Sequence, residues 1–188
     1  MKNLILFGSL LLLILSCTTD INEVDAITND EVFQVEEARG VKILYSDSAQ
    51  VQVRITADSM VRYTDRLDPR DEFPSGIFVE FLNSNGKPYS YLKADNAIRL
   101  EKDNKVIARG NVSFYNTKND KLTSTELIWE EGNGKLWTNK FVRITQPEKG
   151  DTSFGHGFEA NQEFTQFEIK RNTSSRFNID KFKENIEK

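Results

Sequence analysis

Residues 91–120 read YLKADNAIRLEKDNKVIARGNVSFYNTKND, and residues 121–150 read KLTSTELIWEEGNGKLWTNKFVRITQPEKG. The two stretches align position for position. Leu92–Ala97 matches Leu122–Leu127, and a weaker third copy begins at Phe158–Asn161. The register also holds further along, where Val106, Ala108 and Val112 match Leu136, Thr138 and Val142. A repeat of this length predicts β-hairpins stacked into one sheet, each burying a face against the next.

Apolar residues alternate with polar ones inside and around the repeat, as they do in half-buried strands. The alternating residues predicted to point inward are Val53, Ile55, Ile77, Val79, Phe81, Val112, Phe114, Val142 and Ile144. Between these runs lie segments rich in Asn, Asp and Gly, which favour tight turns. The turn segments are residues 83–86, 103–104, 116–120 and 132–134. The sequence therefore predicts an all-β fold of antiparallel strands, with two open edges that favour pairing with other chains.

The N-terminus has the pattern of a secretory signal. Met1-Lys2-Asn3 precedes an apolar run from Leu4 to Leu15, and Ser16-Cys17 follows before the chain turns polar. The run is about a dozen residues, whereas a spanning helix needs roughly 20, so cleavage is favoured over a transmembrane helix. We therefore assign residues 1–16 to a signal peptide.

The cysteine indicates a lipoprotein type of secretory signal. Ile14-Leu15-Ser16-Cys17 resembles the bacterial lipobox, and that resemblance implies lipidation of Cys17 and cleavage before it. The alternative is an ordinary signal peptide with an incidental cysteine. The remaining chain is divided into a lipidated tether (residues 17–32), a folded domain (33–171) and a polar tail (172–188).

Composition excludes several classes of function. The net charge of −4 and pI near 5.2 argue against a nucleic-acid partner. Cys17 and His156 are the only cysteine and histidine, so an intramolecular disulfide and a Cys- or His-rich metal site are excluded. No catalytic or phosphate-loop motif is present, and no cofactor is expected. Glu130-Glu131, beside a turn, is interpreted as a solvated hairpin end.

Several short motifs occur together in a characteristic order. They are residues 45–49 (YSDSA), 72–77 (EFPSGI), 94–97 (ADNA), 108–112 (ARGNV), 125–129 (TELIW) and 155–160 (GHGFEA). In this order and spacing, residues 40–170 resemble the LptC family of lipopolysaccharide transport, in a lipoprotein form of the Bacteroidetes type. Many members of that family keep a spanning helix, which a lipid on Cys17 would replace here.

This resemblance implies an elongated, twisted antiparallel β-jellyroll with OstA-type repeats, similar to LptA and LptC. It implies a non-enzymatic protein whose apolar groove carries the acyl chains of lipopolysaccharide. It also implies an inner-membrane ABC transporter complex as partner at the N-terminal edge and an LptA-like bridge protein at the C-terminal edge. The expected location is the inner membrane, lipid-anchored and facing the periplasm, with the outer membrane less favoured.

Alternatives to this interpretation remain at the level of residues. The nine inward candidates named above are expected to line the groove, but simple core packing explains each of them equally well. Trp129 and Trp137 suggest either cross-strand packing or carbohydrate stacking, the latter in a glycan-binding surface lipoprotein. A glycosidase would need Glu80, Glu126 and Glu168 to point inward together.

Overall fold

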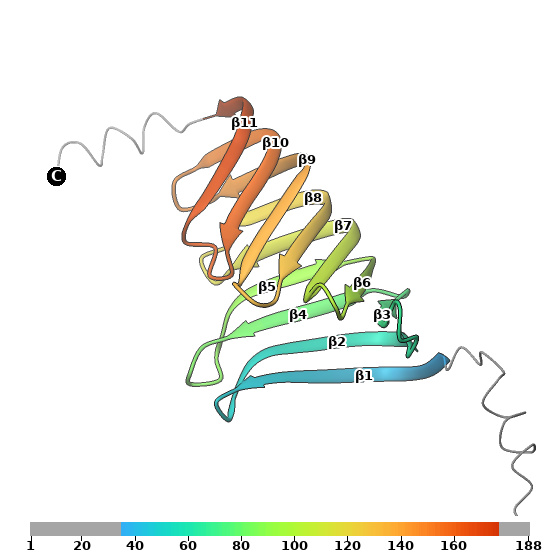
Figure 1. Cartoon of the computed structure of the whole chain (residues 1–188). Helices are drawn as coiled ribbons and strands as arrows, with labels where there is room; N and C mark the ends of the chain where they lie inside the picture. The colour runs from blue at the N-terminus through green and yellow to red at the C-terminus, as the bar shows by residue number, and fades with distance from the viewer. Residues whose placement is uncertain (1–34, 177–188) are drawn as a thin grey trace, which may run out of the picture. The chain divides into compact units, whose positions relative to one another are not determined.

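The computed structural model describes residues 35–176, which form β-strands joined by turns and contain no helix. The strands belong to a single antiparallel sheet, and Figure 1 shows them stacked in near-sequence order from β1 to β11. Their bounds are β1 Val35–Asp47, β2 Gln50–Tyr63, β3 Arg70–Phe73, β4 Ile77–Leu82, β5 Pro88–Ala94, β6 Asn96–Leu100, β7 Lys105–Asn116, β8 Lys121–Glu130, β9 Lys135–Gln146, β10 Asp151–Asn161 and β11 Phe167–Arg176.

The predicted alternation is confirmed in the strands that carry the inward candidates. In β4, Ile77, Val79 and Phe81 are buried, while Phe78 and Glu80 between them are partly exposed. The repeat also keeps its parity, because residues 92 and 122 are both fully buried, as are residues 106 and 136. Period-two burial of this kind is what a strand with one core-facing side requires.

Two long strands each pair with two different neighbours on the same side, which folds the sheet into two layers. β7 pairs with β6 through residues 105–109 and with β5 through residues 113–116. β2 likewise pairs with β4 through residues 53–56 and with β3 through residues 61–63. β4 also pairs with β5, and β3 with β6, so β3–β4 and β5–β6 each follow the same bend from one layer to the other. β8 to β11 then add in sequence order.

The bend from one layer to the other is built by two of the motifs found in the sequence. Gly110 interrupts the β7–β8 register with a φ of +82°, and an added Cβ would lie 2.6 Å from the Cβ of Asp95. The Asp95 carboxylate, between β5 and β6, accepts hydrogen bonds from the backbone N (3.0 Å) and the Nδ2 (2.7 Å) of Asn111. Glycine is needed here because the backbone is left-handed and the neighbouring chain is close.

Hairpin turns lie at the ends of the layers away from the bends. All four turn segments expected from the sequence connect consecutive strands. One layer ends in the turns after β4, β7 and β9, and the other ends in the turns after β6, β8 and β10. The predicted all-β antiparallel jellyroll is therefore confirmed, and we call the side that carries these two rows of turns its open side.

The outer limits of the predicted domains fall largely outside the described residues. The signal peptide, Cys17 and the tether precede residue 35, and residues 177–188 also lie beyond the described range. β11 runs to Arg176, so strand structure continues past the domain end expected at residue 171. Within residues 35–176, no helix is long and apolar enough to cross a membrane.

Candidate lipid-binding interior

The nine inward candidates all meet in the interior. Each has an exposed fraction of 5% or less, and all belong to one continuous apolar cluster drawn from both layers. Their predicted orientation is confirmed. Their role in holding a lipid stays a prediction, because core packing explains the same burial.

The interior is larger than those nine residues. Leucines of the repeat complete both walls, and they are fully buried like their neighbours. These additional residues are Leu92, Leu122, Leu127 and Leu136. Leu136 shares its strand and its parity with Val142 and Ile144, so alternation was a sufficient signal there. Leu122 and Leu127 have opposite parities within β8, where the register shifts between Ser124 and Ile128.

Aromatic rings join the two layers across the middle of the interior. Phe81 of β4 meets Trp129 of β8 edge-on, with ring centroids 5.1 Å apart, and also contacts Phe114 of β7 at 6.3 Å. Trp129 is 2% exposed, so it packs rather than offering a face to sugar. Trp137 is half-buried and donates a 2.9 Å hydrogen bond to Glu130. Both tryptophans therefore follow the packing alternative.

Near the C-terminal end of the sheet, the turn between β10 and β11 closes the open side. It places Phe164, 1% exposed, among Phe114 (centroids 4.9 Å apart), Phe158 (5.9 Å) and Phe167 (5.4 Å). Phe114 belongs to the opposite layer, so one side chain from a turn spans the interior. The sequence prediction missed Phe164, because alternation marks strands and gives no inward direction to a turn residue.

Polar contacts fasten that turn to the opposite layer. The buried Ser90 hydroxyl donates to the carbonyl of Gln162, and Asn116 Nδ2 donates to the carbonyl of Phe164 at 3.4 Å. Tyr89 Oη lies 3.4 Å from Gln162 Oε1, and burial raises the pKa of Tyr89. A buried carbonyl without a donor is costly, so these contacts hold the turn in place.

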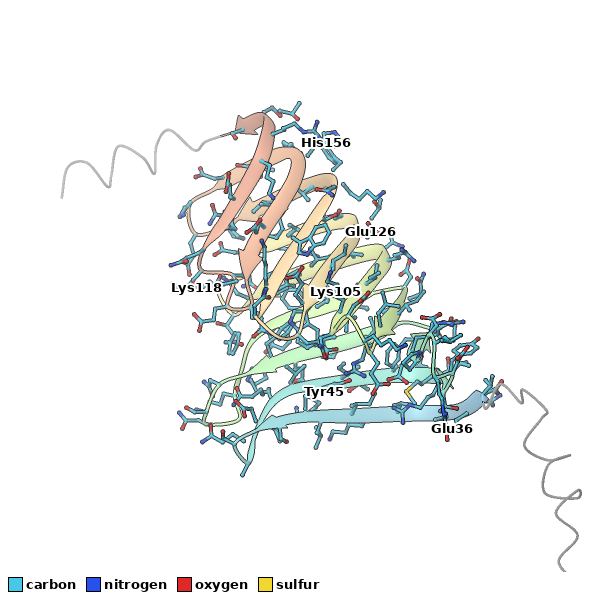
Figure 2. All side chains as sticks on the ribbon, viewed as in Figure 1. Glu36, Tyr45, Lys105, Lys118, Glu126 and His156 are labelled. Carbon is cyan, nitrogen blue, oxygen red and sulfur yellow. The ribbon has the colours of Figure 1, made fainter. Side chains whose placement is uncertain are left out.

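An open cavity of about 450 Å³ lies beside the same turn. One wall comes from the turns after β4, β7 and β9, including Asn83, Lys118 and Lys149. The other wall comes from the β10–β11 turn, including Glu163, and from Phe167 at the start of β11. Figure 2 places Lys118 at the turn between β7 and β8, on this side of the domain. The cavity therefore has a charged rim and an aromatic floor.

Nearer the N-terminal strands, the contact across the open side is polar. The guanidinium of Arg99 lies 5.2 Å from the ring centroid of Tyr45, which β1 contributes from the other layer (Figure 2). Arg99 also binds Glu131 with its Nε 2.7 Å from Oε1, and this hydrogen bond raises the pKa of Arg99. Burial raises the pKa of Tyr45 to about 12. The phenol therefore stays neutral at physiological pH.

A buried carboxylate lies close to Arg99 at this contact. Asp71 of β3 is 4% exposed and accepts from Arg62 Nε at 2.7 Å, while Arg99 Nη1 lies 3.7 Å from its other oxygen. The Asp71 hydrogen bond raises the pKa of Arg62. The same network corrects one prediction: Glu131 is not a solvated hairpin end, because its side chain is only 14% exposed and paired with Arg99. Strand alternation could not reveal this partner, which comes from β6.

The carboxylates that a glycosidase would need do not converge. Glu80 pairs with Arg54 at 2.8 Å, and Glu126 pairs with Arg109 at 2.9 Å. Glu80 lies between the buried Val79 and Phe81, Glu126 is half-buried and precedes the buried Leu127, and Glu168 is exposed. His156 is exposed against Phe141, with centroids 5.3 Å apart (Figure 2). Among residues 35–176, no group of three or more His, Cys, Asp and Glu is placed to hold a metal ion.

Comparison with protein families connects this architecture to a known role. Residues 3–178 match a family model described as LptC: lipopolysaccharide-assembly, LptC-related. A search of curated proteins finds no match. The family match spans every strand described above, the bend formed around Asp95 and Gly110, and the β10–β11 turn. The chain therefore belongs to the LptC family, a transport-associated, non-enzymatic family of periplasmic, inner-membrane-associated components of lipopolysaccharide transport.

Proposed function

We propose that this protein is a lipid-anchored component of the lipopolysaccharide export system, accepting lipopolysaccharide from an inner-membrane ABC transporter complex. Its jellyroll interior holds the acyl chains and passes the lipid to an LptA-like bridge protein. The observation that carries the proposal is the continuous apolar cluster lined from both layers and bordered by an open side.

The energetic reason for such an interior is the cost of exposing lipid to water. Each methylene costs roughly 0.8 kcal/mol, so one chain of about twelve carbons costs near 10 kcal/mol. An apolar trough removes that cost while sugars and phosphates stay in water outside the open side. The negative net charge of −4 favours a grip on the acyl chains over a grip on the phosphates.

The proposed partners use the free edges of the sheet. Within residues 35–176, β1 pairs only with β2 and β11 pairs only with β10. The outer edge of each pairs with no other strand among the described residues, and β-strand addition at such an edge is a common mode of recognition. The transporter complex is assigned to the β1 edge, and the bridge protein to the β11 edge.

The test compares residues of the same kind on opposite faces of one strand. A photo-crosslinking residue replaces Phe81, which faces the interior, or Phe78, which stacks on Tyr91 outside with centroids 5.9 Å apart. In cells, lipopolysaccharide should be captured at position 81 and not at 78. The same contrast applies to Phe114 and Tyr115 of β7. Equal labelling of both faces would contradict an interior route.

A glycan-binding surface lipoprotein is the second candidate, favoured by aromatic rings on the outer face. Tyr91 stacks with Phe78 and with Tyr115, the latter at a centroid distance of 5.0 Å. These three half-buried rings form a row across β4, β5 and β7. Purified protein should then bind oligosaccharides that lack acyl chains, with the affinity lost on replacing Tyr91 with Ala. Absence of such binding would eliminate this candidate.

A further inference from the structure

Phe164 combines two features that seldom occur together in a turn. It is a bulky residue with a φ of +53°, in the left-handed region, and it is almost wholly buried. Non-glycine residues in this region carry a conformational cost, which is sharper for large side chains. The packing of Phe164 against Phe114 and Phe158 must offset that cost.

The residues around Phe164 are suited to leaving the interior. Glu163 and Thr165 on either side of it are exposed, so they are already in water. Among the described residues, the cross-layer hydrogen bonds of the turn are few: Ser90 and Tyr89 to Gln162, and Asn116 to the Phe164 carbonyl. Moving this turn outward therefore breaks a small set of hydrogen bonds and the ring contact with Phe114.

We infer that the β10–β11 turn is a gate, in which Phe164 occupies space that an acyl chain takes when lipid enters. This inference rests on the proposed function. An apolar chain replaces an apolar side chain against Phe114, so the interior stays covered in both states. The turn is also placed at the rim of the open cavity of about 450 Å³, which leads directly to Phe164. Phe164 thus competes with an acyl chain for one position in the interior, against Phe114.

Two variants of the full chain open the gate in different ways. F164A removes the side chain that fills the interior, and S90A removes one hydrogen bond to the turn while leaving Phe164 in place. Loss of that bond should raise the open population about fivefold, and loss of the buried ring at least about tenfold. Hydrogen exchange at residue 164, whose amide bonds to Asn161 at 3.0 Å, should accelerate by these factors.

Capture of lipid is measured in cells with a photo-crosslinking residue at Leu122, which pairs with Phe114 in the sheet. F73A is the matched control, because Phe73 is equally buried but lies in β3 and has no ring contact with Phe164 among the described residues. Capture is normalised to folded protein. Greater capture in F164A and S90A, with no gain in F73A, is the expected result.

Two other outcomes separate the gate from the function. The first is that the unmodified protein captures lipopolysaccharide and that F164A and S90A capture the same amount or less. This result would overturn the gate and leave the proposed function standing. Absence of lipopolysaccharide at Leu122 in the unmodified protein and in every variant would overturn the proposed function itself, and the gate with it. An equal gain in F73A would also overturn the gate, since any enlarged interior would then behave alike.

Discussion

At the scale of single residues, Gly110 is the most constrained position in the bend. Replacing it with Ala forces a Cβ to within 2.6 Å of the Asp95 side chain, in a backbone with φ +82°. Conformational strain and the clash act together, so G110A should lower the free energy of unfolding by at least about 2 kcal/mol. Urea denaturation measures this change, with the m value confirming that the same transition is followed.

Gly86 provides the control for the backbone effect alone. Its φ of +72° is also left-handed, but an added Cβ meets nothing within 4 Å. G86A should therefore cost about 1 kcal/mol. If G86A and G110A were equally destabilising, the close approach of Asp95 would have no energetic role in the bend.

Tyr45 gives the domain a predictable response to alkaline pH. Burial raises its pKa from 10.0 to about 12, so the folded state holds the phenolic proton more tightly than the unfolded state does. The resulting stability is complete below pH 10 and is lost as pH rises from about 10 to about 12. Urea midpoints measured across that range should therefore fall.

Replacing Tyr45 with Phe removes the titrating group and keeps the ring over Arg99. The fall of the urea midpoint with rising pH should be smaller for Y45F than for the unmodified protein. It should not vanish, because burial also raises the pKa of Tyr89 and Tyr115. Identical pH profiles would mean that Tyr45 is as solvated in the folded chain as in the unfolded one.

At the scale of elements, β3 and β6 are short strands held by charge as well as by the sheet. Asp71 of β3 pairs with Arg62 of β2 at 2.7 Å and lies 3.7 Å from Arg99 of β6. D71N keeps the shape but leaves Arg62 without its buried counter-charge, while Arg99 keeps its pair with Glu131. The expected loss is about 2–3 kcal/mol in the free energy of unfolding, moderated by the 43% exposure of Arg62.

Asp68 offers a comparison in the loop that precedes β3. Its carboxylate binds Arg70 at 2.6 Å but is 60% exposed, and an exposed pair adds little to stability. D68N should change the free energy of unfolding by less than about 0.5 kcal/mol in the same urea titration. Equal losses for D68N and D71N would show that burial of Asp71 has no special energetic weight.

The elements were predictable from the sequence where the signal is local. Alternation located the strands, and Asn, Asp and Gly located the turns, because both patterns depend on neighbouring residues. The partners of Glu131 and the inward position of Phe164 were not predictable in this way. The partner of Glu131 comes from β6, which lies two strands away in the same layer, and Phe164 meets Phe114 of β7 only after the sheet folds into two layers.

At the scale of the whole domain, the open side is crossed by two different kinds of contact. Near the N-terminal strands, Tyr45 and Arg99 meet through a ring and a cation. Near the C-terminal strands, Phe164 meets Phe114 through two apolar rings. Under the proposed function, the interior must be packed and must also be able to exchange its contents. Two separate contacts would then allow the part of the open side at Phe164 to open while the part at Tyr45 and Arg99 stays closed.

The proposed anchor at Cys17 lies outside the described residues. If the acyl chains on Cys17 hold the protein at the inner membrane, C17A should move the mature domain to the soluble periplasmic fraction. The apolar cluster formed by residues 35–176 does not involve Cys17, so the thermal midpoint should stay unchanged. The tether expected from the sequence, roughly 15 residues, would keep the domain within a few tens of ångströms of the bilayer, at about 5–6 Å times the square root of its length. Lipopolysaccharide capture at position 81 should therefore weaken in C17A and recover when a transmembrane helix replaces the anchor. Full capture by the released domain would instead mean that pairing at the β1 edge, without the anchor, is sufficient to hold the domain at the transporter.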